Sequence, residues 1–472
     1  MRQARLLIDG EWVDGASTTE LLDKYDGSVV AEVHEADQAQ VDQAVAGVAV
    51  AQKEIDFPHF KRYEVLIRAA GLLQQRTDLV GAIVDDTGFT LGDAEREISR
   101  AVQTLTTSGE EAKRIHGEMV PLHGAPGGAG RLAFTVRHPV GVVAAITPFN
   151  SPLNTVAHKV GPALAAGNGV VLKPAAYTPL TAGILAEVLL EAGLPARLLS
   201  VLNGSGSKVG EWLLQSQIPA FYAFTGSTGV GTHIRQAVGL RKTQLELGSL
   251  ASTIVCADAD LARAASACVG AAFRKAGQVC TSIQRLYVER SALDEFGSLL
   301  AADLGGRAFG DPRQPGAFVG PVISSSDADR IESWIEQARD KGAEVVAGGK
   351  REGQVIAPTV LAGVDPATNV FSQEVFGPVV NLVPFDEFDA ALADVDDTPF
   401  GLAAGIFTRD IGRALTAAER LRMGSVHINE TSSSRVDLMP YGGVKESGSG
   451  VEGPRYAIEE MTEQRLITIG RP

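Results

Sequence analysis

The chain has 472 residues, of which 45% are hydrophobic and 21% are charged, and its formal net charge is −15. This composition is typical of globular proteins, and the length exceeds what one hydrophobic core usually supports, so two sizeable domains are expected. The negative charge disfavours a general surface for nucleic acid or for anionic membranes.

The amino-terminal residues and the cysteines indicate the compartment. The start, MRQARLLIDGEWVDG, has an apolar run of only three residues, which predicts neither a signal peptide nor a transmembrane helix. The three cysteines form no C-x-x-C pair, which argues against a disulfide framework and a thiolate metal site. The eight histidines show no H-E-x-x-H or similar spacing. We therefore expect a cytoplasmic protein without a metal site.

The first 115 residues read mostly as helices, because apolar residues recur at helical spacing. The helical stretches are 41–55, 62–88 and 93–115. From residue 139 onward, short β-branched runs alternate with helical stretches at 180–195 and 207–217. The runs expected to be strands are 140–146, 169–175, 198–204 and 220–226. Strands that alternate with helices predict a parallel sheet with right-handed crossovers.

A second alternating series begins near residue 251 and continues to about residue 430. Its further strands are expected at 285–291, 344–349, 379–385 and 404–409. The glycine-rich segment 123–139 is predicted to form a projecting hairpin, with which the carboxyl-terminal run 463–470 could pair. Neither segment could bury much surface alone, so we expect a contact between subunits of a homodimer or homotetramer.

A glycine-rich turn at residues 224–238, FTGSTGVGTHIRQAV, follows one predicted strand. The strand ends at Gly226, Ser227 can cap the next helix, and glycines leave the first turn of that helix without side chains. Exposed N–H groups at a helix N-terminus bind anions such as a dinucleotide pyrophosphate. Lys173 lies at the carboxyl end of another predicted strand, where parallel sheets bind ligands. A structural turn and a solvated lysine are the alternative interpretations.

Two polar side chains in apolar surroundings have the chemistry of catalytic groups. Glu246 stands between Leu245 and Leu247, and such a slot should raise the pKa of a carboxyl and suit a general base. Strand alternation alone would instead point Glu246 to water. Asn150 follows a strand and a proline, where its amide could donate to an oxyanion or form only an Asx turn.

Cys280 differs from the other two cysteines in its neighbours. In KAGQVCTSI, residues 275–283, it follows a glycine and a glutamine and precedes Thr281, a polar and open setting that favours a reactive thiol. Cys268 belongs to an apolar helical stripe, and Cys256 ends an apolar strand. Both are expected in the core.

Seven motifs in order, ITPFN, LKPA, FTGS, LELG, GQVC, EVFGP and PYGGVKESGSG, resemble the aldehyde dehydrogenase superfamily across essentially the whole chain. The resemblance implies the α/β aldehyde dehydrogenase fold. It places a Rossmann-like parallel-sheet cofactor domain in residues 1–117 and 139–247 and a second α/β catalytic domain in 248–445. A small β oligomerisation flap would use 118–138 and 446–472.

The resemblance also implies the reaction and the residues that perform it. Cys280 would attack the aldehyde, Asn150 would hold the oxyanion, and Glu246 would activate the water that hydrolyses the thioester. The product would be a carboxylic acid, and the cofactor would be NAD⁺ or NADP⁺. The implied cofactor contacts are Thr147, Pro148, Phe149, Lys173, Gly226, Ser227, Gly248, Glu374 and Phe376.

Departures from the family pattern bear on cofactor and substrate. Ala176 and Gly229 stand where many NAD-preferring relatives have glutamates, so NADP⁺ could also be accepted, with NAD⁺ favoured by a narrow margin. Ser249 and Leu250 resemble a bacterial branch that includes lactaldehyde and non-phosphorylating glyceraldehyde-phosphate dehydrogenases. Small and polar residues on the helical stripe within 93–115 favour a short, hydroxylated or anionic aldehyde. The candidate substrate residues are Arg100, Thr104, Thr107, Ser108, Thr281 and Arg435.

Three other functions compete with this interpretation. A CoA-acylating relative would use CoA in place of water, but such relatives usually lack the glutamate found at position 246. A nucleotide-binding protein on the same fold could lack catalysis altogether. A cofactor-independent thiol hydrolase would need a Cys–His–Asp set, and no convincing one is present in the sequence.

Overall fold

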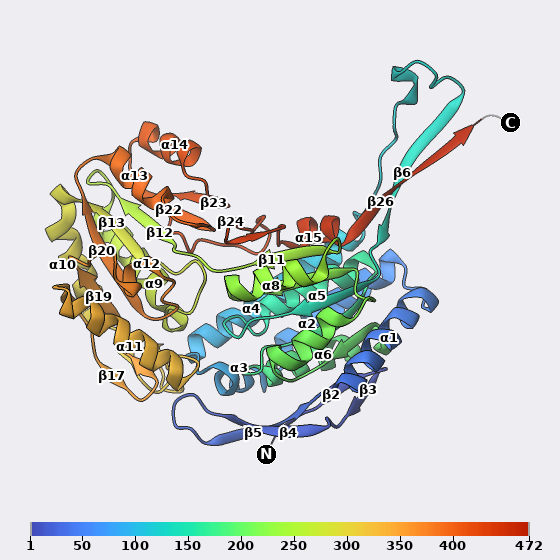
Figure 1. Cartoon of the computed structure of the whole chain (residues 1–472), viewed down its shortest axis with the longest axis horizontal. Helices are drawn as coiled ribbons and strands as arrows, with labels where there is room; N and C mark the ends of the chain where they lie inside the picture. The colour runs from blue at the N-terminus through green and yellow to red at the C-terminus, as the bar shows by residue number, and fades with distance from the viewer. Residues whose placement is uncertain (1, 471–472) are drawn as a thin grey trace.

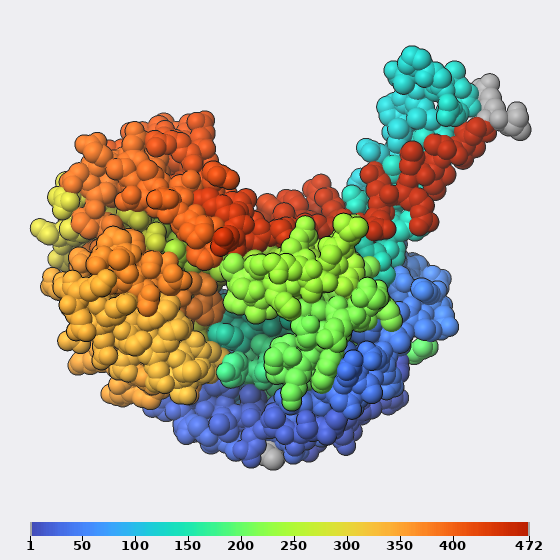
Figure 2. Space-filling model, viewed as in Figure 1, coloured from blue at the N-terminus to red at the C-terminus, as the bar shows by residue number. Residues whose placement is uncertain are grey.

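The computed structural model describes residues 2–470. Two α/β bodies lie side by side, and a two-stranded ribbon projects from one of them (Figure 1). The first body is built mainly from the amino-terminal half of the chain, and the second lies between residues 250 and 430 (Figure 2). In the described chain every helix is too short or too polar to cross a lipid bilayer.

The first body contains an eight-stranded sheet in the order β25-β11-β10-β7-β8-β9-β2-β3. Its five central strands run parallel, as the sequence predicts. They are β7 (Val142–Ile146), β8 (Gly169–Lys173), β9 (Leu199–Val201), β10 (Phe221–Thr225) and β11 (Lys242–Glu246). The outer strands are β2 (Leu6–Ile8), β3 (Glu11–Val13) and β25 (Gly448–Ser449). Strands β7 to β9 are buried throughout, because helices cover both faces of the sheet.

The helices of the first body pack around this sheet (Figure 1). They are α1 (Gln38–Glu54), α2 (His59–Gln75), α3 (Leu79–Thr87), α4 (Leu91–Ala112), α5 (Asn154–Ala166), α6 (Pro179–Glu191), α7 (Glu211–Gln215), α8 (Thr228–Val238) and α15 (Pro454–Glu460). The helix predicted over 62–88 is two helices, because the chain leaves α2 at Arg76, whose guanidinium bonds the Asp78 carboxylate at 2.8 and 2.9 Å. The helix predicted over 207–217 is a π-helical turn, Gly206–Gly210, that leads into α7.

The prediction that the first 115 residues are mostly helical is confirmed for 38–112, but residues 2–35, where no element was predicted, form strands. Besides β2 and β3, these residues form β1 (Arg2–Ala4), β4 (Ser17–Leu22) and β5 (Val29–Glu35), which make a separate three-stranded sheet. Strands of three residues are too short to display a period of two. In β4 five of the six residues are exposed, so its pattern carries no hydrophobic alternation.

The second body contains a seven-stranded sheet in the order β16-β19-β20-β13-β12-β22-β23. Its strands are β12 (Ser252–Val255), β13 (Arg285–Glu289), β16 (Glu344–Ala347), β19 (Thr359–Ala362), β20 (Val379–Phe385), β22 (Ala403–Phe407) and β23 (Ser425–Ile428). Its helices are α9 (Leu261–Phe273), α10 (Leu293–Gly305), α11 (Ser325–Asp340), α12 (Asn369–Ser372), α13 (Phe388–Asp396) and α14 (Ile411–Arg420). Every predicted strand of this series is confirmed. Short ribbons pair β14 (Ala308–Phe309) with β15 (Ala317–Val319), β17 (Arg351–Glu352) with β18 (Val355–Ile356), and β21 (Phe400–Gly401) with β24 (Val444–Lys445).

The projecting ribbon pairs β6 (Arg131–Pro139) with β26 (Thr462–Gly470) in antiparallel register. This confirms the predicted pairing with the carboxyl-terminal run. The predicted hairpin within 123–139 does not form, and the other neighbour of β6 is a single bridge from Met119 to Phe134. Residues 446–461 instead return to the first body as β25 and α15, so within the described part of the predicted segment, 446–470, only β26 lies in the ribbon (Figure 1).

Candidate active site

A cavity of about 520 Å³ lies where the two bodies meet, and residues of both line it. Loops after β7, β10 and β11 contribute from the first body, and the segment before β13 contributes from the second. Most of the predicted site residues are brought together here. They are Pro148, Phe149, Asn150, Gly226, Ser227, Glu246, Gly248, Cys280, Thr281, Glu374, Phe376, Arg100 and Arg435.

Five predicted site residues do not line the cavity. Thr104 donates to Asn154 Oδ1 at 2.8 Å, while Thr107 and Ser108 donate to main-chain carbonyls one turn back in α4. Most side chains of the predicted polar stripe therefore form hydrogen bonds within α4 or to α5, and do not face the cavity. Thr147 and Lys173 lie at the carboxyl ends of neighbouring parallel strands, where Thr147 N donates to Lys173 O at 3.1 Å.

The backbone before Cys280 adopts a conformation that few side chains tolerate. Lys275 and Ala276 have φ values of 53° and 54°, and Gly277 follows at 69°. A Cβ on Gly277 would lie 2.0 Å from the carbonyl oxygen of Gly377, so only glycine fits there. Left-handed non-glycine residues cost about 1–3 kcal/mol each and persist only where the surroundings hold them. Such strain clusters at functional sites.

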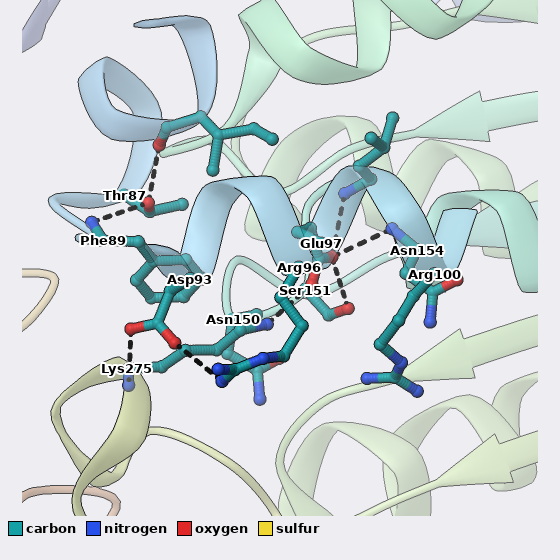
Figure 3. A network of polar contacts seen from close by, with 12 residues as sticks. Thr87, Phe89, Asp93, Arg96, Glu97, Arg100, Asn150, Ser151, Asn154 and Lys275 are labelled. Carbon is teal, nitrogen blue, oxygen red and sulfur yellow. Dashed lines mark hydrogen bonds and ion pairs between the residues drawn. The ribbon is translucent and has the colours of Figure 1, made fainter. Parts of the chain in front are cut away.

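The surroundings that hold this segment are carboxylates of α4 (Figure 3). Lys275 Nζ lies 2.7 Å from Glu97 Oε2 and donates to the Asn150 carbonyl at 2.9 Å, and Lys275 N donates to Asp93 at 3.1 Å. Glu97 also accepts from Ser151 Oγ at 2.6 Å. One buried ion pair thus connects helix α4, the Asn150 loop and the Cys280 loop. Glu97 and Lys275 were not predicted as site residues from the sequence, although Lys275 opens the segment KAGQVCTSI that contains Cys280.

The Asn150 amide is fixed to the segment that carries the thiol. Its Nδ2 donates to the Gln278 carbonyl at 2.8 Å, two residues before Cys280. An amide nitrogen has two hydrogens, so one donor is left for another acceptor. This geometry suits the oxyanion role that the sequence predicts.

Glu246 is 3% exposed, and in the described chain neither carboxylate oxygen has a hydrogen-bond partner. Burial, together with the nearby Glu452 carboxylate, raises the pKa of Glu246 well above its usual value. Strand alternation alone predicted a side chain that faces water. That expectation was wrong because β11 is no edge of the sheet, since β25 pairs with it, and the side chain lies in the cavity wall near Glu452, Lys159 and Arg435. A buried, unpaired carboxylate at a cavity is suited to accept a proton.

The Cys280 side chain lies at the cavity wall, with Sγ 2.8 Å from the hydroxyl of Tyr441. Burial raises the pKa of the Cys280 thiol to about 11. Cys268 and Cys256 are buried in the apolar cores, as predicted, and burial raises the pKa of Cys256 to about 11 and that of Cys268 further still. Cys280 alone of the three lines the cavity.

The neighbouring part of the cavity fits a dinucleotide. Ser227 caps α8 by accepting from Val230 N, which leaves the helix N-terminus beside Gly226. Glu374 Oε1 accepts from Ser249 N at 3.0 Å, and a Cβ on Gly248 would lie 2.9 Å from Glu374 Oε2. A helix N-terminus for phosphates and a nearby carboxylate for ribose hydroxyls are the elements that nicotinamide dinucleotides require.

A nucleotide site on a parallel sheet, beside a thiol, an amide and a buried carboxylate, is typical of an oxidoreductase that uses a nucleotide cofactor and a cysteine thiol. The sequence model of the aldehyde dehydrogenase family matches residues 12–467, and the chain belongs to this family. It is an NAD(P)-dependent aldehyde dehydrogenase, which oxidises an aldehyde to the acid.

Individual relatives make the similarity more specific. The chain is 47% identical over 470 residues to 3-sulfolactaldehyde dehydrogenase of Priestia aryabhattai, with 99% of this chain and 98% of the relative covered. The NADP-dependent glyceraldehyde-3-phosphate dehydrogenase of Bacillus halodurans C-125, solved with NADP, superposes with a TM-score of 0.96 at 33% identity over the full length of both chains. An indole-3-acetaldehyde dehydrogenase of P. syringae, solved with NAD⁺, gives 0.95 at 34% identity, covering 100% and 97%.

Proposed function

We propose that the protein oxidises a short, hydroxylated aldehyde that carries an anionic group, of the 3-sulfolactaldehyde type. In this proposal Cys280 is the nucleophile, Asn150 binds the oxyanion and Glu246 is the general base. The similarity to 3-sulfolactaldehyde dehydrogenase supports the substrate class. The positive charge described below supports it independently.

The proposed reaction follows from the positions of three side chains. The Cys280 thiolate attacks the carbonyl carbon, and the oxygen that becomes negative accepts from Asn150 Nδ2 and the Cys280 N–H. The nicotinamide cofactor, when bound near Glu374 and Phe376, supplies the oxidant that turns the thiohemiacetal into a thioester. Glu246 then takes a proton from water, whose oxygen attacks the thioester carbon and releases the acid and the Cys280 thiol.

The observation that carries the substrate class is the guanidinium of Arg274. It lines the cavity and donates to Ser433 Oγ at 2.7 Å, and within residues 2–470 no carboxylate lies at ion-pair distance from it. Burial, and then the charge of Arg100, lower the pKa of Arg274. By contrast Arg100 and Arg435, the sequence-predicted candidates, already hold Asp437 and Glu452 at 2.7 and 3.1 Å. An unpaired, half-buried guanidinium is the group best placed to bind a sulfonate.

Replacing Arg274 with methionine is expected to lower kcat/KM for 3-sulfolactaldehyde about 10- to 150-fold. This fold-change corresponds to the free energy of one hydrogen bond between charged groups. Lactaldehyde has a methyl group where the sulfonate is attached, so its kcat/KM should change by less than about threefold. Arg307→Met, at a partly buried pair with Asp303 outside the cavity lining, is the matched control. Equal losses for the two aldehydes would exclude Arg274 as the anion-binding residue.

Glu246→Gln should spare the first turnover and slow the steady state, because only thioester hydrolysis needs the base. A burst of reduced nicotinamide close to one per active site is the expected result in rapid-mixing experiments. A raised pKa means that the carboxylate fraction of Glu246 grows with pH over a range above that of an ordinary glutamate. Wild-type steady-state turnover should therefore rise with pH, and the variant should lack that rise. Equal loss of burst and steady state would assign Glu246 a positioning role.

For the cofactor we propose a narrow preference for NAD⁺ over NADP⁺. Lys173, the predicted ribose-binding lysine, is buried, which lowers its pKa to about 8, and the Glu35 carboxylate acts on it in the opposite direction. A carboxylate that acts on Lys173 would also repel a 2′-phosphate.

Exposed Leu132, Leu466 and Ile469 on the projecting ribbon support a subunit contact in a homodimer or homotetramer. A cytoplasmic location stays a prediction.

A further inference from the structure

A tyrosine hydroxyl lies against the proposed nucleophile. Tyr441 Oη is 2.8 Å from Cys280 Sγ, and the Tyr441 side chain is largely buried. Within residues 2–470 this is the one hydrogen bond that the hydroxyl makes. No role in the reaction described above has been given to it.

The position of the Tyr441 ring does not depend on that hydroxyl. Tyr441 N donates to the Glu452 carbonyl at 3.1 Å, and Glu452 N donates back to the Tyr441 carbonyl at 2.6 Å. The Arg435 guanidinium carbon lies 3.7 Å from the ring centroid, and Arg435 Nη2 lies 3.1 Å from Glu452 Oε2. Lys159 pairs with the other Glu452 oxygen at 3.0 Å. The ring is therefore held by its main chain and by a stacked cation.

The direction of the hydrogen bond follows from the chemistry of the two groups. A thiol is a weak donor and a phenol a strong one, and once Cys280 is ionised only Tyr441 can donate. Burial and the neighbouring Cys280 raise the pKa of Tyr441 well above its ordinary value. The phenol thus keeps its proton under conditions in which the thiol loses one.

We propose that Tyr441 donates a hydrogen bond to the Cys280 thiolate and stabilises it as the nucleophile, with the Arg435 cation stacked on the phenol ring in support. Tyr441 is thereby a catalytic residue, because its hydroxyl touches the reacting sulfur. The inference rests on the proposed function, in which Cys280 is the nucleophile. A cation over the ring face is attracted to the phenol and adds positive charge near the sulfur. When sulfur bonds to the carbonyl carbon, it loses its charge and the hydroxyl is released from it.

Other charged groups also act on the Cys280 sulfur. The Arg435 cation favours the thiolate, while Glu374 and Glu246 disfavour it; Arg274, from the segment before Cys280, is a further cation close enough to feel the thiolate charge. Tyr441→Phe leaves all four in place and removes one oxygen atom. The variant therefore isolates the hydroxyl.

The test measures the thiol itself, without aldehyde or cofactor. Purified enzyme is mixed with 4,4′-dithiodipyridine in a pH-jump stopped-flow instrument, so each rate between pH 7 and 11.5 is recorded before alkaline unfolding. Tyr441→Phe is compared with wild type and with Tyr456→Phe, a tyrosine of α15 outside the cavity. Cys280→Ala gives the background from the two buried cysteines.

We expect the pH–rate profile of Cys280, compared on its rising limb up to pH 11.5, to move to higher pH in Tyr441→Phe, because losing a hydrogen bond to a charged group raises the pKa of the thiol by about one to two units. A less stable thiolate is also a stronger nucleophile, so the net rate at pH 8 should fall only about 3- to 16-fold. Tyr456→Phe should match wild type. A shift below about 0.3 unit, or a faster reaction at pH 8 as expected when a removed atom merely opens access, would overturn the proposal.

A second variant keeps the inference testable if Tyr441→Phe fails to fold. Arg435→Lys keeps the charge beside Glu452 but removes the planar cation from the ring face, and should raise the apparent pKa by a smaller amount in the same direction. The proposed function is judged separately by aldehyde oxidation. An unshifted thiol pKa with intact turnover refutes the role of Tyr441 alone, whereas turnover that survives Cys280→Ala refutes the nucleophile.

Discussion

Cys280→Ala is expected to abolish aldehyde oxidation, with turnover reduced on the order of 10⁴-fold or more, because no other group can form the thiohemiacetal and thioester. Cofactor binding should survive, since Glu374, Ser227 and the α8 N-terminus are untouched. Reduced nicotinamide formation measures the first effect. Quenching of protein fluorescence on titration with NAD⁺ or NADP⁺ measures the second.

The matched control is Cys268→Ala. Cys268 is 1% exposed and packs in the core of the second body, so its removal should cost stability and leave turnover intact. Each variant loses one thiol, Cys280→Ala at the cavity wall and Cys268→Ala in a hydrophobic core. A difference in turnover between them therefore reflects the position of the thiol. Substantial turnover in Cys280→Ala would show that a different residue attacks the aldehyde.

Asn150→Ala is expected to lower kcat by about 10²–10³-fold, the usual effect of removing one oxyanion donor. KM should change less, because the negative charge on oxygen develops only in the transition state. Steady-state kinetics with 3-sulfolactaldehyde and lactaldehyde should give the same loss, since both form the same oxyanion. This distinguishes Asn150 from Arg274, whose effect should depend on the sulfonate.

Asn203→Ala is the control for lost stability. Asn203 is 2% exposed, donates to the Ala4 carbonyl at 3.2 Å and does not line the cavity. It should lower the unfolding temperature without a comparable loss of kcat. A loss of less than about threefold in Asn150→Ala would exclude the oxyanion role.

Particular elements show what could be predicted from the sequence and what could not. The central strands β7, β8, β9 and β10 were predictable, because a parallel sheet covered on both faces requires continuous apolar runs. Most strands of residues 2–35 were not, since β1, β2 and β3 have three residues each and β4 is exposed at five of its six residues. The pairing of β6 with β26 was predictable as a possibility, but the sequence also permitted a local hairpin, which does not form.

The catalytic set could be predicted because its motifs are contiguous. GQVC, LELG and ITPFN each place one chemical group at the end of a strand or loop, and the cavity brings these three together. The substrate stripe could not be predicted in the same way. A helical wheel gives the face on which Thr104, Thr107 and Ser108 lie, but only packing decides whether that face meets a cavity or another helix, and it meets α5.

The sequence by itself determined the two α/β series, the family motifs and the identity of the thiol, amide and carboxylate, because these depend on local order and residue type. The tertiary structure decided which charges are paired. Arg100 pairs with Asp437, which is distant in sequence, and Arg435 pairs with Glu452 from another loop. Within residues 2–470 Arg274 has no carboxylate at ion-pair distance and donates to Ser433. The tertiary structure also decided the contact between Cys280 and Tyr441, which are 161 residues apart. Local patterns fix what a side chain is, and only packing fixes what it faces.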